Sequence, residues 1–192
     1  MNKINIIDCT LRDGGYYNNW NFPNNLVNEY LKSVSESGIK YVELGFRSLN
    51  KKEFKGPNWY TTDSYIDHLV VPRKLKLGVM VNMSELMLKK LERNKIINKL
   101  FKNKKESKIN FIRIAAHFKE FENALEVCKI LKSKGYIVCI NLMQISEQSK
   151  ENIYLATKKS NIYKPDVLYF ADSLGSMRSN DIIKIVKEFR KN

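Results

Sequence analysis

The chain has 192 residues, 43% of them hydrophobic and 11% aromatic, which is typical of one globular domain with its own core. The formal net charge is +14, but only seven of the 34 basic residues are arginine. Because arginine is the residue that binds phosphates and bases through paired hydrogen bonds, the lysine excess does not predict a nucleic-acid-binding protein. No apolar run approaches the length of a bilayer, so we expect no membrane partner.

The three cysteines, Cys9, Cys128 and Cys139, lie within apolar segments. An odd number of such thiols is typical of a reduced intracellular protein and not of a secreted one held by disulfides. The N-terminal sequence also lacks the apolar core and the cleavage site of a signal peptide. We therefore expect a cytoplasmic protein.

Short β-branched runs alternate with longer helical patterns about every thirty residues, which predicts repeated βα units and a parallel sheet. The first unit combines a strand at 4–8 with a helix at 23–37, after a polar loop, and Gly38 ends that helix. The second combines a strand at 40–46 with a short helix at 63–70, after a long loop.

Four further units follow with shorter connections. The third helix begins at Ser84, and Ser179 is the expected N-cap of the last helix. The predicted strands and the helices after them are 76–82 with a helix from 84, 109–116 with 119–134, 136–143 with 146–160, and 166–171 with 179–192.

No linker divides these six units, so we expect residues 1–192 to form one domain. The turn after the first strand lacks the G-x-G-x-x-G spacing of a dinucleotide-binding sheet. The pattern therefore favours an α/β fold of the TIM-type (β/α)8 barrel, of which this chain supplies strands 1–6 and lacks strands 7 and 8.

In such barrels the functional side chains follow the carboxyl ends of the strands. Here every predicted strand ends in polar residues. Because buried ionisable groups cost several kcal/mol unless they are paired, packing alone does not account for this repetition. The polar residues at the six strand ends are Asp8, Thr10, Arg12 and Asp13; Glu43 and Arg47; Asn82; Arg113 and His117; Asn141 and Gln144; and Asp172 and Ser173.

The segment 8–15, D-C-T-L-R-D-G-G, resembles the D-x-T-L-R-D-G motif that opens members of the DRE-TIM metallolyase superfamily. These include hydroxymethylglutaryl-CoA lyase, 4-hydroxy-2-oxovalerate aldolase, and the isopropylmalate and homocitrate synthases. The segments 41–46, 111–115 and 171–175 resemble the family's strands 2, 4 and 6, so the resemblance covers the whole chain. It implies a metal-dependent carbon–carbon lyase or aldolase, or an acyl-transferring synthase, that acts on a 2-oxo acid or an acyl-CoA through an enolate.

The resemblance also implies roles for single residues. Asp13 is expected to bind a divalent metal, Mg²⁺ or Mn²⁺, since hard cations prefer carboxylate oxygens. Arg12 is expected to stabilise the enolate oxygen with charge-assisted hydrogen bonds. Tyr16 stands where the aldolases of the family have a histidine base, and a neutral tyrosine is a poor base at neutral pH. Glu43 either orders Arg12 through an ion pair or forms a purely structural salt bridge.

A substrate-binding role is expected for Arg113, His117, Asn141, Asp172 and Ser173. Three of them have plainer alternatives. His117 is equally an ordinary polar loop residue, and Asn141 can satisfy backbone groups in its loop. Asp172 can act as the cap of the turn into the last helix.

The family completes its metal site with a His-x-His pair on strand 7, and the two histidines of this chain, His68 and His117, are too far apart to supply it. We therefore expect an incomplete barrel that is inactive alone. The alternative is a non-catalytic remnant, or half of a split barrel that pairs with a chain bearing strands 7 and 8 or with a second copy. Nucleic-acid binding by the lysines of 95–108 is the remaining option, but no nucleic-acid-binding signature with interleaved aromatic residues accompanies them.

Overall fold

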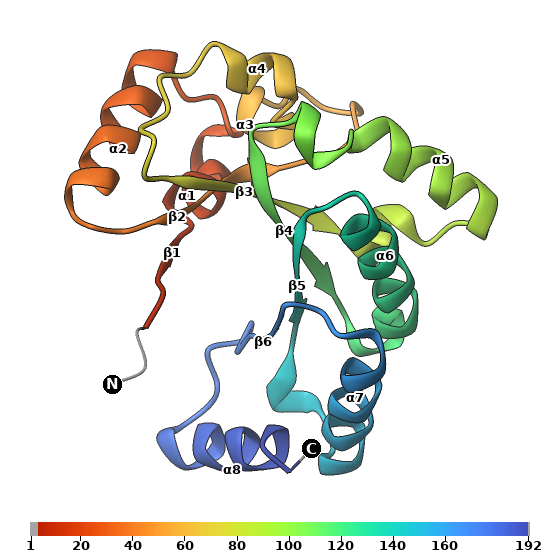
Figure 1. Ribbon diagram of the computed structural model, residues 1–192. Helices are drawn as coiled ribbons and strands as arrows, with labels where there is room; N and C mark the ends of the chain where they lie inside the picture. Colours follow the sequence, from red (N-terminus) through yellow and green to blue (C-terminus); the bar gives the residue numbers. More distant parts are fainter. Residues whose placement is uncertain (1–3, 192) are drawn as a thin grey trace.

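A computed structural model describes residues 4–191. Its six strands form one parallel sheet in which they lie side by side in chain order. The sheet curls and the longer helices line its outer side, which leaves an open half-barrel (Figure 1). The predicted α/β fold class is confirmed. The strands are β1 (Ile7–Asp8), β2 (Tyr41–Phe46), β3 (Lys76–Asn82), β4 (Ile109–Ala116), β5 (Ile137–Leu142) and β6 (Val167–Phe170).

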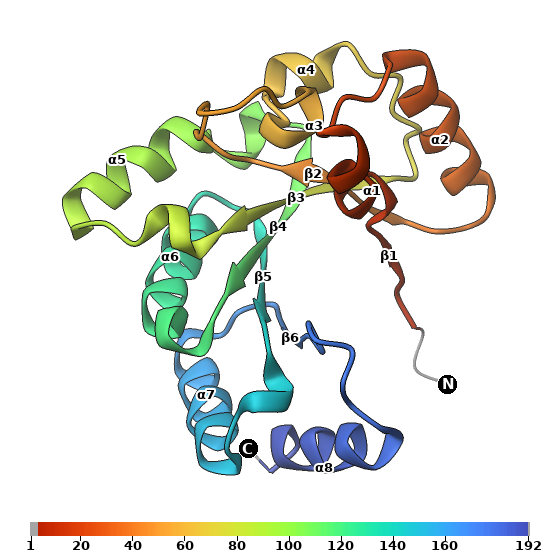
Figure 2. The same ribbon diagram turned by 180° about the vertical axis from the view of Figure 1, so that it is seen from behind.

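Each strand is followed by at least one helix, as the βα pattern predicts. Figure 2 shows from behind that α2 and α8 lie near opposite ends of the curled sheet. The helices are α1 (Thr10–Asn18), α2 (Asn24–Glu36), α3 (Pro57–Tyr60), α4 (Asp63–Asp67), α5 (Lys90–Leu100), α6 (Phe121–Ser133), α7 (Lys150–Tyr163) and α8 (Ser179–Phe189), with 3-10 turns at Met83–Leu86, Lys104–Glu106, Phe118–Glu120 and Ile145–Glu147.

The largest difference from the sequence prediction lies directly after β1. Residues 10–18 were expected to form a polar loop, but they form α1, which packs against β2. Gly14 and Gly15 concealed this helix, because each glycine disfavours a helix interior by about 1 kcal/mol. Burial of Leu11 and Gly15 compensates for that cost. The motif residues therefore lie on a helix and not in a turn.

Smaller corrections concern the ends of elements. β1 pairs only over Ile7–Asp8, and α3 occupies part of the predicted long loop. α4 ends at Asp67 instead of residue 70, and the N-cap of α8 is Arg178, one residue before the predicted Ser179. Gly38 does end the first long helix, where its φ of +86° is a conformation that glycine adopts without strain.

The core lies between the sheet and the helices. Val42 and Leu44 of β2 and Ile112 and Ile114 of β4 are fully buried in it. Because successive strand residues point to opposite faces, the alternate residues Glu43, Arg113 and Asn141 lie on the concave face. The residues of the helices that complete this core include Val27, Leu31, Ile97, Val127, Cys128 and Leu131.

The two edges of the sheet differ from its centre. β1 has a partner only in β2, and β6 only in β5. Ile4 and Ile6, which precede β1, are 85% and 59% exposed, and Leu174 after β6 is 53% exposed. Within the part of the chain that the structure describes, no helix is both long enough and apolar enough to span a membrane.

Candidate functional site

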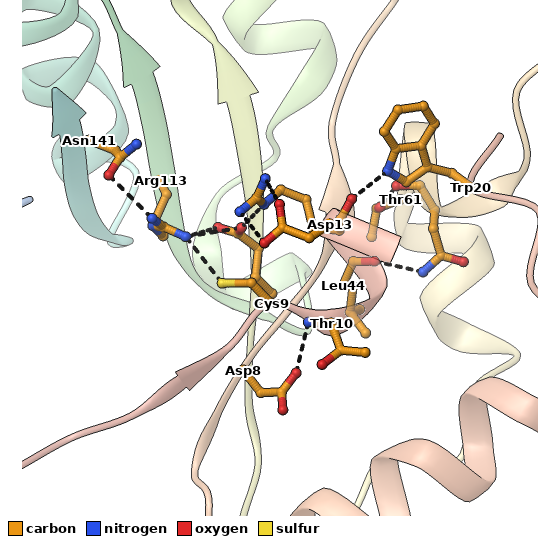
Figure 3. Close-up of polar contacts among 12 residues, drawn as sticks. Asp8, Cys9, Thr10, Asp13, Trp20, Leu44, Thr61, Arg113 and Asn141 are labelled. Carbon is orange, nitrogen blue, oxygen red and sulfur yellow. Dashed lines mark hydrogen bonds and ion pairs between the residues drawn. The ribbon is translucent and has the colours of Figure 1, made fainter. Parts of the chain in front are cut away.

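The junction between β1 and α1 is fixed by Asp8. Its carboxylate accepts a hydrogen bond from the Thr10 amide at 2.8 Å (Figure 3). It accepts another from the Tyr30 hydroxyl on α2. Burial acts to raise the pKa of Asp8, but the hydrogen bonds from Tyr30 and Thr10 outweigh it and hold that pKa below its usual value. Asp8 therefore orders the start of α1 as an ionised acceptor.

The centre of the site is Glu43, a carboxylate on β2 with no exposed surface. Arg12 of α1 donates from Nε to Oε1 of Glu43 at 2.5 Å. Arg113 of β4 donates from one terminal nitrogen to both oxygens of Glu43 at 3.1 Å. Two guanidinium groups from different elements thus share one buried carboxylate. Figure 3 shows Arg113 directed toward Cys9 and Asn141.

Arg113 extends this cluster toward the later strands. It contacts Cys9 Sγ at 3.3 Å and donates to Oδ1 of Asn141 at 3.4 Å. Its guanidinium carbon lies 5.0 Å from the centre of the Tyr169 ring, within cation–π distance. Residues from the β1–α1 junction, β2, β5 and β6 therefore converge on this one arginine of β4.

Cys9 is a protonated thiol in this setting. Burial raises its pKa to about 11, and the negative charge of Glu43 acts in the same direction. Burial likewise raises the pKa of Tyr169. At neutral pH both groups are uncharged, so the charges of the cluster come from its arginines and carboxylates.

Arg12 also reaches toward solvent. Its terminal nitrogens contact the two oxygens of Asp13 at 2.6 and 3.0 Å, and the Asp13 side chain is 61% exposed. Burial acts to lower the pKa of Arg12, but the charges of Glu43 and Asp13 outweigh it, and the pKa lies above its usual value. Arg12 is therefore a permanent cation between a buried carboxylate and an exposed one.

The fit of a metal ion can be judged from the donor set. Asp13 is a suitable oxygen ligand, but both its oxygens contact Arg12. Among residues 4–191, no three histidine, cysteine, aspartate or glutamate side chains lie close enough together to hold a metal ion. One exposed carboxylate does not retain Mg²⁺ or Mn²⁺, which take several oxygen ligands. The described residues thus do not form a complete metal site.

The structure brings together five of the residues expected at the site, namely Arg12, Asp13, Glu43, Arg113 and Asn141. The ion pair between Arg12 and Glu43 that the sequence offered as one alternative is present. The other expected residues lie outside this cluster.

Tyr16 and His117 are the first two of these. The Tyr16 side chain is 65% exposed and its ring meets that of Trp20 edge-on, with centroids 4.7 Å apart. His117 is half-buried, and its backbone amide donates to Glu120 at 3.0 Å. Neither side chain has a hydrogen bond to the cluster among the residues that the structure covers.

Asp172 and Ser173 act on backbone amides. Asp172 accepts hydrogen bonds from the amides of Ser176 and Met177 at 3.1 and 2.9 Å, which matches the plainer expectation of a turn cap. Ser173 accepts from the amide of Gln144 at 3.1 Å. In this structure both residues order the loops after β5 and β6.

Sequence reasoning missed two members of the cluster and assigned one residue to the wrong group. Cys9 and Tyr169 contact Arg113, and Tyr169 pairs in register with Asn141. Strand alternation from Asn141 was the signal that could have found Tyr169. Arg47, grouped with the polar strand ends, is buried and binds the Thr61 carbonyl at 2.8 and 3.0 Å, so it holds a loop.

Comparisons with known proteins agree with the motif resemblance. The chain is 23% identical over 187 residues to the oxaloacetate decarboxylase of Mycobacterium tuberculosis, across 96% of this chain and 52% of that protein. It is 23% identical over 189 residues to the 4-hydroxy-2-oxovalerate aldolase of Geobacillus genomosp. 3, across 98% of this chain and 54% of that protein. The chain thus spans about half the length of these curated relatives. No protein-family model matches it.

Solved structures of an aldolase domain and a lyase have a similar fold. The N-terminal domain of a proposed aldolase from Bacteroides vulgatus superposes with a TM-score of 0.84 at 29% identity, over 98% of this chain and 60% of that one. The HMG-CoA lyase from Brucella melitensis shares the fold, with a TM-score of 0.67 at 11% identity over 98% of this chain and 68% of that one. The relatives support a lyase-type function at the general level. Together the comparisons support a DRE-TIM-like aldolase domain, at low sequence identity to the proteins that the chain resembles.

Proposed function

We propose that this chain is a lyase-type domain that binds a 2-oxo acid, or an acyl-CoA as the other substrate class, and stabilises its enolate. Arg12 carries the chemistry, and Glu43 and Arg113 hold it in place. The observation that supports this most directly is the buried carboxylate of Glu43 shared by two guanidinium groups on the concave face. Asn141 completes the proposed substrate-binding group through Arg113.

Arg12 has donors left for a substrate. A guanidinium has five N–H groups. The contacts to Glu43 and Asp13 use three of them. Because Asp13 is exposed, its pair with Arg12 contributes little, and a substrate oxygen can replace it. Nε of Arg113 is also buried and has no partner among residues 4–191, so it is a second donor for an anionic substrate.

The proposed step is the breaking of a carbon–carbon bond beside a carbonyl. The electron pair of that bond moves to the carbonyl oxygen as an enolate. The other fragment leaves as CO₂ when it is a carboxylate, or as an aldehyde when it bears a hydroxyl group whose proton passes to solvent water. Donors that are already fixed in place stabilise such an oxyanion more than water does, because they need no reorganisation. Glu43 fixes Arg12 in this way. Tyr16 lies one turn further along α1, on the face of Arg12, and we assign it the delivery of a proton to the product.

Asp13 remains the proposed metal ligand of this chain. A bound Mg²⁺ or Mn²⁺ would need further ligands than residues 4–191 supply, so the step above depends on side chains alone. His117, Asp172 and Ser173 keep a proposed part in substrate binding only if their loops rearrange, because each lies outside the cluster.

Hydrogen exchange in the substrate tests this proposal without knowledge of the second substrate. Wild-type protein is mixed with pyruvate in D₂O, with and without Mg²⁺, and loss of the methyl signal is followed by proton NMR. The proposed stabilisation of the enolate predicts that the protein accelerates the exchange, whereas a partial barrel that is inactive alone does not. Arg12→Lys should reduce the rate about 100-fold, the usual effect of losing an oxyanion donor. Arg178→Lys, at an exposed arginine before α8, is the control and should leave the rate unchanged.

Oxaloacetate and 4-hydroxy-2-oxovalerate are tested in parallel, with decarboxylation and cleavage as the respective readouts. No acceleration with any of the three compounds, or equal rates for wild type and Arg12→Lys, contradicts the proposed function.

The second proposed function is that of a half-barrel that works with a partner chain or a second copy. Its support is the exposure of Ile4, Ile6 and Leu174 near the two open edges of the sheet. Light scattering after size-exclusion chromatography measures the mass in solution. A dimer that Ile6→Lys converts to monomer supports a second copy at the β1 edge, whereas a wild-type monomer at all concentrations contradicts self-association.

A further inference from the structure

Arg12 is held from two sides. Its side chain binds Glu43, while its backbone carbonyl accepts a hydrogen bond from Nε1 of Trp20 at 2.9 Å. Figure 3 shows the Trp20 indole nitrogen pointing at α1. A helical carbonyl has a second lone pair for such a bond. Trp20 is only 3% exposed, so this contact is shielded from water.

The Trp20 indole packs directly against α1 at Gly15. A Cβ added at Gly15 would lie 2.0 Å from Cδ1 of Trp20, so only glycine lets the ring lie this close to α1. Gly14, beside it, has no such contact: a Cβ there would approach only Phe22, at 3.8 Å. Glycine weakens a helix, and at position 15 the packed indole accounts for its presence.

The chain must fold back sharply to bring the indole there. Asn19 and Trp20 have φ values of +56° and +57°, which non-glycine residues rarely adopt. Such backbone conformations persist where the surrounding structure holds them, and they cluster at functional sites. The structure therefore holds two strained residues directly after α1, next to the proposed site.

A segment from the β2–α4 connection holds this turn. The Gly56 amide donates to the Asn19 carbonyl at 2.7 Å, and the Asn58 amide donates to the Trp20 carbonyl at 3.3 Å. The Trp59 ring lies 4.5 Å from the Trp20 ring between centroids. The turn is thus fixed by both backbone and ring contacts.

We propose that Trp20 is a positioning residue for Arg12. Held by the segment 56–59, it sets the position of the Arg12 backbone and so the direction in which the guanidinium presents its remaining N–H groups. This inference rests on the proposed function where it concerns substrate. The position of Arg12 itself can be measured without any substrate.

Two matched pairs of variants test it. Trp20→Phe removes the indole N–H that binds Arg12, whereas Trp59→Phe removes a buried indole N–H with no hydrogen-bond partner among residues 4–191. Gly15→Ala displaces the Trp20 ring, whereas Gly14→Ala meets only ordinary contact distances. Both members of each pair alter the same small region.

Two readouts are taken for each variant, with the melting temperature recorded alongside. The first is the Kd for oxalate, a planar dianion that mimics an enolate, by calorimetry. The second is the Nε–H signal of Arg12 in a proton–nitrogen NMR spectrum, assigned by its loss in Arg12→Lys. We expect Trp20→Phe and Gly15→Ala to raise the oxalate Kd about three- to tenfold and to shift the Arg12 signal, the usual range for one hydrogen bond. Trp59→Phe keeps an aromatic ring beside Trp20 and loses no hydrogen bond, so it should change neither readout, and Gly14→Ala should change neither.

The outcomes separate this inference from the proposed function. If wild type does not bind oxalate, the proposed anion site fails, and the Arg12 signal alone decides on Trp20. A shift in Trp20→Phe and Gly15→Ala but not in the controls supports positioning, and an unchanged signal overturns it. Binding losses that follow the melting temperature equally in all four variants also overturn it, since Trp20 then has only a structural role. If Trp20→Phe does not fold, the glycine pair gives the same test.

Discussion

Toward the β1–β4 end of the sheet the polar side chains contact one another, whereas at the β6 end they contact backbone amides. Arg12, Glu43 and Arg113 come from three elements and share one buried carboxylate. Asp172 and Ser173 bind amides of Met177 and Gln144 in nearby loops.

Both groups are polar residues on the parallel strands or in the segments that follow them, and both match segments of the family motif. The difference lies in burial and in the kind of partner. A buried charge needs a charged partner, which fixes long-range geometry, whereas an exposed carboxylate can satisfy a turn. Position at a strand end is therefore weaker evidence for a role than the partners a side chain has.

The largest effect that this difference predicts is at Glu43. Glu43→Gln leaves Arg12 and Arg113 without their shared charge, and breaking a buried ion pair typically costs about 3–5 kcal/mol. Urea unfolding measures the loss of stability. Glu122→Gln, which removes a fully exposed partner of Lys159, is the control and should leave the unfolding curve in place. A loss for Glu43→Gln as small as that of the control means that the cluster is not the ordered centre of this end.

Arg113→Lys sharpens the comparison within the cluster. Lysine keeps the charge near Glu43 but lacks the fork that also reaches Cys9 and Asn141. We expect a loss of about 1.5–3 kcal/mol in the free energy of unfolding, the range for hydrogen bonds to charged groups. Arg190→Lys, at an exposed arginine, is the matched control. Equal stability of the two variants indicates that Glu43 needs only a positive charge at position 113 and not the forked guanidinium group.

At the other end, Asp172→Ala should cost about 1 kcal/mol, as the loss of a helix or turn cap does. The reason is that the amides of Ser176 and Met177 lose their acceptor. Urea unfolding and pyruvate hydrogen exchange are measured together. Exchange at the wild-type rate fits a structural residue, and a large drop in the rate places Asp172 with Arg12 in the reaction.

The smallest effect is expected for Ser173→Ala. Ser173 is exposed and accepts one hydrogen bond, from the Gln144 amide at 3.1 Å. The free energy of unfolding should stay within about 0.5 kcal/mol of wild type, as for most surface substitutions. The same two measurements check this, and a loss larger than that of Asp172→Ala contradicts the order of effects given above.

Sequence patterns located the strands well because the buried strands are apolar runs that can be recognised in the sequence. The bounds of β3 and β4 are those predicted, since both are apolar β-branched runs with polar flanks. α1 escaped prediction because Gly14 and Gly15 oppose a helix locally. Trp20 packs on Gly15, and the segment 56–59, which is distant in the sequence, holds Trp20 there.

The site was predictable to the extent that its residues belong to a motif. Arg12, Asp13 and Glu43 were singled out in this way. The contact of Cys9 and Tyr169 with Arg113 depends on the curl of the sheet, which brings β1 and β6 toward β4. Tyr16 and His117 lie outside the cluster although the motif and the strand end favoured them, because the direction of a side chain depends on its neighbours.

The order of the strands has a consequence for how the molecule forms. Every strand pairs with the strand of the preceding unit, so each βα unit can dock on structure that has already been synthesised. Glu43 lies 31 residues after Arg12 but 70 residues before Arg113. During synthesis the carboxylate therefore meets its first arginine well before its second. When β4 pairs with β3, Arg113 binds Glu43 and completes the ion cluster. At that stage the growing sheet acquires its concave face.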